Sequence, residues 1–240
     1  MLSRTGNPLG SGMGFLRSFM KEVEGLRTPL LPVGILLVGT LSFLLYKDKN
    51  LYSAIRPELL RASEILHLGP DCIYSFLTLF LLPLLFLFVM RQNPRDYGLS
   101  LGRVRLALPL LVLISAVLTV CCGLIADMEA MKTYYAANLR HLGDYFYLFV
   151  TYLLYMWSWE FINRGFLLIG LKRYVGVYSV YIQLIPFVIL HVGKPTFELY
   201  GSIPFGLLLG FYAYLTNSFL YCVIVHAYFA TMLRVFVSLS

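Results

Sequence analysis

The feature that most constrains the fold of this chain is a series of seven long apolar runs. They lie at about 29–46, 72–90, 106–126, 145–171, 176–191, 200–215 and 218–237. A transmembrane helix needs roughly 20 predominantly apolar residues. The runs are continuous and do not alternate as barrel strands do, so only helices can satisfy the backbone in lipid. We therefore predict an all-α, polytopic transmembrane bundle of about seven spans.

The composition agrees with this prediction. Hydrophobic residues make up 59% of the chain and charged residues only 13%, and the mean hydropathy is +0.77. A soluble domain usually has about a quarter of its residues charged. The basic residues behind the net charge of +7 lie mostly in short segments between apolar runs, which is typical of membrane topology. We expect the lipid bilayer as a partner, no nucleic acid, and a multi-pass integral membrane location, which in a bacterium is the cytoplasmic membrane.

Three parts follow along the chain. Residues 1–28 form a cytoplasmic N-terminal arm, in which the apolar and charged residues from Phe15 to Leu26 alternate as in an interfacial helix; a disordered tail is the alternative. Residues 29–90 hold the first two spans and a connecting loop, and residues 91–240 form the helical core. The basic residues of 91–105 and 172–175 place both loops in the cytoplasm. The N-terminus is then inside, and the C-terminus is outside if all seven runs cross.

The apolar runs of the core contain one glutamate, one arginine and two histidines that we select as candidates: Glu160, Arg164, His191 and His226. A charged side chain at the centre of a bilayer costs about 2.5 to 3.5 kcal/mol, so such residues usually mark a functional site. Glu160 and Arg164 are four residues apart, which predicts a salt bridge on one helix face. A helical rise of about 1.5 Å per residue places all four in one slab. We expect them to line one water-filled cavity that opens toward the cytoplasm.

Two kinds of chemistry suit these residues. In the first, Glu160 acts as general base on a water held by His191 or His226, and the other histidine or Arg164 stabilises an oxyanion. In the second, His191, His226 and Glu160 bind a divalent metal such as zinc and leave a position for water. The spacing does not choose between them. The purely structural alternatives are an ion pair that only stabilises the helix and histidines that only bond backbone carbonyls.

Three ordered motifs carry a family resemblance. Glu160-Phe-Ile-Asn-Arg164-Gly165, then Phe187-Val-Ile-Leu-His191, then His226 resemble the EExxxR, FxxxH and HxxxN motifs of the CPBP (ABI) intramembrane proteases, which include the CAAX endopeptidases. The resemblance covers about residues 90–235. It implies a protease that cleaves a membrane-associated or prenylated peptide. It also implies that Glu160, Arg164, His191 and His226 are the catalytic residues of a family core within 91–240.

Two positions depart from the family pattern. Trp159 stands where the family has its first glutamate, which is credited with activating water, and Ala230 stands where the last motif has asparagine. The alternative function is therefore a catalytically inactive relative that binds hydrophobic peptides as a scaffold or immunity factor. As a further hypothesis, Glu198 folds back beside His191 and supplies the second carboxylate. The competing interpretation is that Glu198 is a solvated loop residue paired with Lys194.

Overall fold

A computed structural model describes residues 30–66, 69–135 and 141–240, and within these ranges the chain forms helices and no strand. The all-α prediction is confirmed. The N-terminal arm, with its expected interfacial helix, lies outside the described residues. In chain order the elements are α2 (Leu30–Lys47), α3 (Lys49–Leu66), α4 (Pro70–Ser75), η1 (Phe76–Leu81), α5 (Leu82–Val89), η2 (Pro94–Tyr97), α6 (Val104–Ile125), α7 (Glu129–Tyr135), α8 (Leu142–Glu160), η3 (Phe161–Ile169), α9 (Gly170–Val175), α10 (Tyr178–Leu190), α11 (Thr196–Thr216) and α12 (Leu220–Leu239).

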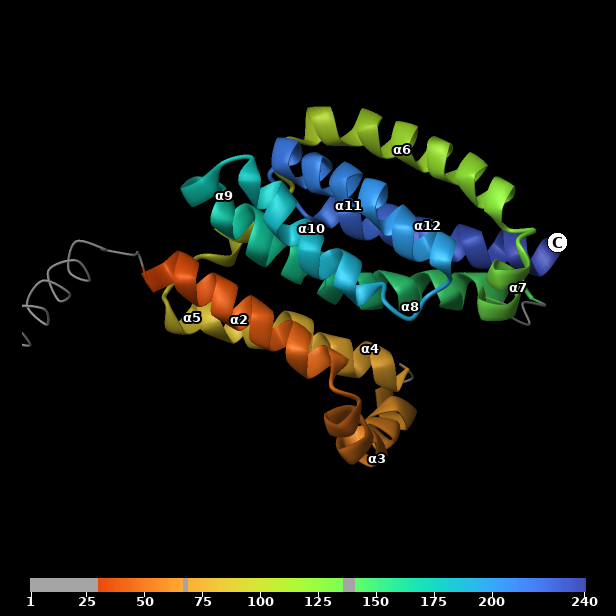
Figure 1. Ribbon diagram of the computed structural model, residues 1–240, viewed down its shortest axis with the longest axis horizontal. Helices are drawn as coiled ribbons and strands as arrows, with labels where there is room; N and C mark the ends of the chain where they lie inside the picture. The colour runs from red at the N-terminus through yellow and green to blue at the C-terminus, as the bar shows by residue number, and fades with distance from the viewer. Residues whose placement is uncertain (1–29, 67–68, 136–140) are drawn as a thin grey trace, which may run out of the picture.

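The long helices form a bundle with their axes roughly aligned (Figure 1). Helix α12 packs against α8 on one side and α6 on the other, and α10 packs against α11 and η3. Helix α2 packs with η1 and α5 on the opposite side of the bundle from α6 (Figure 1). The chain segment from α8 through η3 to α9 is continuous and touches most of the other elements. It is the central rod around which the site is built.

Among the described residues, five helices are long and apolar enough to cross a membrane. They are α2, the continuous helix from α4 to α5, α6, α11 and α12. The shorter apolar helix α10 and the rod from α8 to α9 lie among them in the bundle (Figure 1). The chain is thus an integral membrane helical bundle, and the number of seven crossings stays a prediction.

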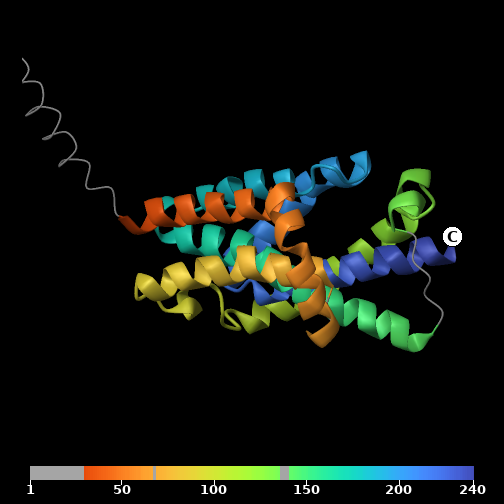
Figure 2. The ribbon, with the colours of Figure 1, turned by 90° about the horizontal axis from the view of Figure 1, so that it is seen from below.

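Helix α3 occupies the segment that we expected to be a connecting loop. It follows the C-terminal end of α2 and runs across the direction of the long helices, as the orange helix in Figure 2 shows. Asp48 precedes it and its Oδ1 accepts hydrogen bonds from the backbone N–H groups of Asn50 and Leu51, at 2.9 and 3.1 Å, as a helix cap does. Leu51, Ile55 and Leu59 recur every four residues, and Leu59 is buried. This amphipathic pattern is too polar to span a membrane, so a search for apolar runs missed it.

The two loops that carry many of the basic residues meet at one end of the bundle. Arg173 Nη2 donates to Gln92 Oε1 at 3.1 Å, and the backbone N–H of Arg103 donates to Thr216 O at 2.8 Å. Gly102 permits this approach, because its φ is +53° and a Cβ there would lie 2.1 Å from Thr216 O. The prediction that both loops lie on the same side is confirmed, and we call this side the basic end.

The opposite end holds the C-terminal ends of α2 and α10. Lys47 Nζ donates to Leu190 O at 3.0 Å, which links the last residues of these two helices. Helices α3 and α7 and the start of α11 also lie at this end (Figure 1). The basic end and this opposite end give a reference for the direction of the cavity.

Candidate active site

The site begins at a change of helix type. Glu160 is the last residue of α8, and the following nine residues form the π-helix η3, every residue of which is buried. Wide π-turns inside α-helices occur frequently at functional sites. Gly165 lies within η3 at a close contact, since a Cβ there would be 2.9 Å from Tyr97 O. The rod is therefore enclosed by protein at the point where its charged residues lie.

Glu160 and Arg164 form the predicted salt bridge. Arg164 Nη1 donates to Glu160 Oε1 at 3.1 Å, and both side chains are 0% exposed. Arg164 Nη2 donates to Gly206 O at 3.4 Å, and the guanidinium carbon lies 4.0 Å from the centre of the Phe187 ring. Breaking a buried pair by removing one partner typically costs about 3 to 5 kcal/mol. The pair thus anchors the rod against α10 and α11.

His226 joins this pair from α12. Its Nδ1 donates to Glu160 Oε1 at 2.6 Å. An ionised carboxylate only accepts hydrogen bonds, so the imidazole proton is on Nδ1 and Nε2 carries the free lone pair. A carboxylate that orients a histidine in this way prepares its Nε2 to take a proton. The geometry places Glu160 behind His226.

His191 is held in a similar tautomer by the backbone. It follows the last residue of α10, and its Nδ1 donates to Phe187 O at 2.8 Å, one turn earlier. The structural alternative of a histidine bonded to a backbone carbonyl is therefore true for this nitrogen. Because Nδ1 carries the proton, Nε2 is the acceptor. His191 also lines a cavity, so the backbone bond orients the ring for contact with whatever enters there.

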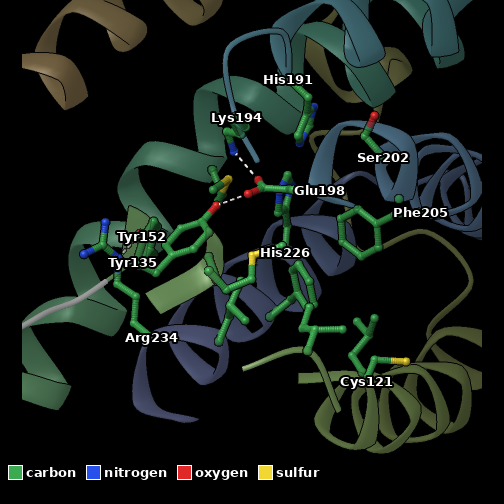
Figure 3. A pocket seen from close by; sticks show the side chains of 18 of the residues that line it. Cys121, Tyr135, Tyr152, His191, Lys194, Glu198, Ser202, Phe205, His226 and Arg234 are labelled. Atoms are coloured by element: carbon green, nitrogen blue, oxygen red, sulfur yellow. Dashed lines mark hydrogen bonds and ion pairs between the residues drawn. The ribbon is translucent and has the colours of Figure 1, made fainter. Parts of the chain in front are cut away.

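A cavity of about 1060 Å³ has His191 and His226 in its wall (Figure 3). Its lining is mostly apolar and comes from α6, α7, α8, α11 and α12 and from the start of α4. Glu160 and Arg164 are fully buried behind it. The expectation that all four residues line one cavity is corrected to two, because Glu160 and Arg164 are fully buried among η3, α10, α11 and α12 and do not reach the wall. The charged side chains in the wall, besides the histidines, are Asp71, Lys194, Glu198 and Arg234.

The cavity lies toward the end of the bundle opposite the basic end. Its lining includes Asp71 at the start of α4, Lys194 between α10 and α11, and Arg234 near the end of α12. The expected opening toward the basic loops is therefore wrong. The expectation was based on the position of each residue along its helix, which gives only its depth in the membrane. The end at which a cavity opens depends instead on where neighbouring helices diverge.

Trp159 stands where the family pattern has a glutamate, and its indole ring packs against both histidines. It is buried, and its ring meets His191 and His226 edge-on, with centroids 5.6 and 6.4 Å away. Tyr46 and Tyr155 pack against its other side, at 5.9 and 5.6 Å. Such edge-to-face contacts restrict the imidazole rings. Trp159 supplies no carboxylate but fixes the orientation of both histidines.

Glu198 lies in the same cavity as His191, as the compensation hypothesis expects, but its two oxygens are engaged. Lys194 Nζ donates to Oε1 at 2.6 Å, and the Tyr135 hydroxyl donates to Oε2 (Figure 3). Burial, followed by the negative charge of Glu198, raises the pKa of Tyr135 in α7. The pairing with Lys194 is thus present, although the two side chains are only 22% and 12% exposed and not solvated.

The predicted metal ligands do not form a metal centre. Among the described residues, no group of three His, Cys, Asp or Glu side chains is arranged to hold an ion. Glu160 Oε1 is taken by Arg164 and His226, and Nδ1 of His191 by Phe187 O. In the described part of the chain these three side chains are thus not grouped as ligands of one ion, and no step below uses a metal.

Two charged residues in the wall, Asp71 and Arg234, escaped the sequence analysis. Arg234 lies eight residues after His226 in α12, and its Nε donates to the Tyr152 hydroxyl at 2.6 Å. Its guanidinium lies 5.4 Å from the ring of Tyr135 and 5.7 Å from that of Tyr152. The available signal was the charge itself, since an arginine inside an apolar run marks a functional position by default.

The comparisons with known proteins agree with the site. The fold and the residues define a helical membrane protein with a Glu–Arg–His cluster at a cavity. Residues 141–232 match a family model described as Rce1-like, type II CAAX prenyl endopeptidase, and this match supports the resemblance to the CPBP (CAAX protease) family over that part of the chain. The matched range contains Glu160, Arg164, His191 and His226. Comparison with curated proteins and with solved structures found no match.

Proposed function

We propose that this protein is an intramembrane endopeptidase that hydrolyses a peptide bond in a membrane-associated or prenylated peptide. The observation that carries the proposal is the hydrogen bond from His226 Nδ1 to the buried Glu160, at the wall of a mostly apolar cavity. The match to a protease family over residues 141–232 supports the reaction class. In contrast to the assignment from sequence, His226 and not Glu160 is the base.

In the mechanism, Nε2 of His226 takes a proton from water while the water oxygen attacks the peptide carbonyl carbon. Glu160 stabilises the imidazolium that forms, and Arg164 holds the Glu160 side chain in place. As the C–N bond breaks, the imidazolium returns the proton to the leaving amine, so the products are a carboxylic acid and an amine. Proton transfer by a positioned histidine typically contributes about 10²- to 10⁴-fold. His226 is thus the catalytic residue, and Glu160 and Arg164 are positioning residues.

His191 has a different task. With its proton on Nδ1, its Nε2 accepts a hydrogen bond from the second O–H of the attacking water. Two acceptors then orient one water, which reduces the entropic cost of bringing it to the carbonyl. Trp159 keeps the two rings in this relation through its edge-on contacts.

The apolar part of the cavity suits a lipid chain. Val117 and Leu124 of α6 and Leu208 of α11 line it, and they are 54%, 76% and 40% exposed. In a membrane, apolar residues exposed on spanning helices face lipid. A hydrophobic substituent on the substrate can therefore enter from the bilayer, while the peptide extends to the polar end of the cavity.

The test is detection of new peptide termini by mass spectrometry after the purified protein, in lipid, receives prenylated and membrane-spanning peptides. We expect cleavage by the wild type and its loss in His226→Ala. The matched control is His141→Asn, because His141 is exposed at the start of α8, away from the cavity, and asparagine preserves its capping role. Equal cleavage by His226→Ala would disprove the mechanism.

A second function is favoured by Trp159 and Ala230, which remove two polar groups of the family pattern. In this alternative the cavity binds lipidated or hydrophobic peptides without cleaving them. Binding of such peptides by well-folded wild type, with no new termini, would establish the inactive binding protein.

A further inference from the structure

Lys47 is a cation that the proposed mechanism does not use and that lies outside the lining of the cavity. It is the last residue of α2, and its side chain reaches across to the end of α10. In the part of the chain that the structure describes, no carboxylate lies within salt-bridge distance of its ammonium group. Nζ donates instead to Leu190 O at 3.0 Å and to Val192 O at 3.4 Å. These are the carbonyls of the residues on either side of His191.

The turn after α10 uses these hydrogen bonds. The last carbonyls of a helix have no partner within the helix, and a cation near them also interacts favourably with the helix dipole. His191 O accepts from the backbone N–H of Lys194 at 3.1 Å, so the carbonyls of residues 190–192 all have donors. Gly193 has a φ of +97°, which lets the chain turn directly after them. Lys47 thus supplies the donors for two of the three carbonyls around His191.

The backbone at this turn determines how the His191 ring is held. Nδ1 donates to Phe187 O, one turn earlier, and this bond requires the helical turn from Phe187 to His191 to stay closed. Without the bonds from Lys47, this last turn can open more easily. The imidazole would then leave Phe187 O, and its proton would no longer be confined to Nδ1.

The end of α2 is itself fixed to neighbouring helices. The hydroxyl of Tyr46 bonds to that of Tyr155 in α8, and the Tyr74 hydroxyl of α4 donates to Leu45 O. The rings of Tyr46 and Tyr74 are also stacked, with centroids 6.0 Å apart. Lys47 therefore extends toward α10 from a point that is held on two sides.

We propose that Lys47 is a positioning residue, which acts through the backbone of His191 to hold the imidazole toward the attacking water. Its effect on catalysis rests on the proposed function, whereas its effect on the His191 ring does not. The proposal extends the active site to α2, which lies outside the residues 141–232 matched by the family model.

Steady-state kinetics on a cleaved peptide gives the first test. Lys47→Met should lower kcat about three- to tenfold, which is the effect of losing one or two typical hydrogen bonds. KM should stay within about twofold, because Lys47 does not line the cavity. Lys47→Arg should restore most of kcat, since a guanidinium also donates to two carbonyls. The matched control is Lys49→Met, which removes an exposed charge at the start of α3, and an equal loss of kcat there would overturn the proposal.

A double-mutant cycle with His191→Ala separates positioning from general stabilisation. His191→Ala keeps the proposed base, His226, so we expect a residual rate. If Lys47 acts through His191, then Lys47→Met should change kcat by less than about twofold in the His191→Ala background. An equal loss of kcat in both backgrounds would show that Lys47 acts elsewhere and would overturn the proposal.

Nitrogen NMR spectra of isotope-labelled histidine, recorded on the protein in lipid bilayers, test the effect on the ring without any substrate. The His191 signals are assigned by their loss in His191→Ala. The wild type should give one set of them, with the proton on Nδ1, and Lys47→Met should add a second set from the other tautomer while the His226 signals stay unchanged. Such a change in a protein that cleaves no peptide would support the role of Lys47, and the protease proposal alone would fail. Identical His191 signals in the wild type and Lys47→Met would overturn the role of Lys47, whether or not peptides are cleaved. If Lys47→Met does not fold, Lys47→Gln takes its place in each measurement.

Discussion

His226 Nδ1 and Glu160 Oε1 are 2.6 Å apart across 66 residues of sequence. The same oxygen accepts from Arg164 at 3.1 Å. One carboxylate oxygen therefore connects the central rod to α12 and determines which nitrogen of His226 carries the proton. The role of each residue in the proposed mechanism follows from this contact.

Replacing Glu160 by Gln should lower kcat by about 10²- to 10⁴-fold with a small change in KM, because the imidazolium loses its counter-charge. The fold should be kept, since the amide oxygen still accepts from both neighbours. Steady-state kinetics on a cleaved peptide, with Glu58→Gln on the exposed α3 surface as control, measures this. An unchanged kcat would remove Glu160 from the mechanism.

Arg164→Met should lower the free energy of unfolding by about 3 to 5 kcal/mol, since it leaves Glu160 buried without its cation. The double variant Glu160→Gln with Arg164→Met should lose less, because no unpaired charge remains. Chemical unfolding in detergent micelles gives both values. Equal losses in the single and double variants would contradict a stabilising ion pair.

Trp159→Ala should cost about 3 to 5 kcal/mol of stability and also lower kcat, because the cavity it leaves frees both imidazole rings. Trp159→Phe should keep most activity, as an aromatic ring stays behind the histidines. Thermal unfolding and cleavage rates for the two variants test this. Higher activity in Trp159→Ala would show instead that the tryptophan inhibits the site.

Gly206→Ala should destabilise the protein by about 1 to 3 kcal/mol, because the added Cβ would lie 2.6 Å from Leu184 Cδ1 and 2.7 Å from Phe187 Cδ1. The added Cβ would displace Phe187. The backbone carbonyl of Phe187 accepts the hydrogen bond from His191, and its ring lies against the Arg164 guanidinium. Gly201→Ala on the same helix is the control, since its Cβ meets nothing within 4 Å. Unfolding midpoints that fall equally for both variants would contradict close packing at Gly206.

Glu198→Gln should leave kcat within about threefold of the wild type, because both carboxylate oxygens serve Lys194 and Tyr135 and neither serves water. Loss of the charge should also lower the pKa of the Tyr135 phenol, since that charge adds to the effect of burial. Cleavage kinetics and the ultraviolet titration of tyrosine measure the two effects. A loss of kcat as large as that of Glu160→Gln would revive Glu198 as the second carboxylate.

The amino-acid sequence determined the helical membrane fold, the boundaries of the apolar segments to within a few residues, and the Glu160–Arg164 pair. These features are local: apolar length and i to i+4 spacing act within one segment. The order of the three motifs also carried the resemblance to the CPBP family, which the match over residues 141–232 supports. For the same reason, the amphipathic helix α3 was missed, because its signal is a weaker periodicity and not an apolar run.

Only the tertiary structure decided which atoms meet and in which direction the cavity opens. The contact of Glu160 with His226, the burial of Glu160 behind the wall and the pairing of Glu198 all join residues from different segments. Such contacts depend on how helices cross and where they diverge, which no single segment encodes. The sequence therefore named the chemical groups, and the packing of α12 against the rod brought His226 to Glu160 and left Arg234 as a cation at the far end of the cavity.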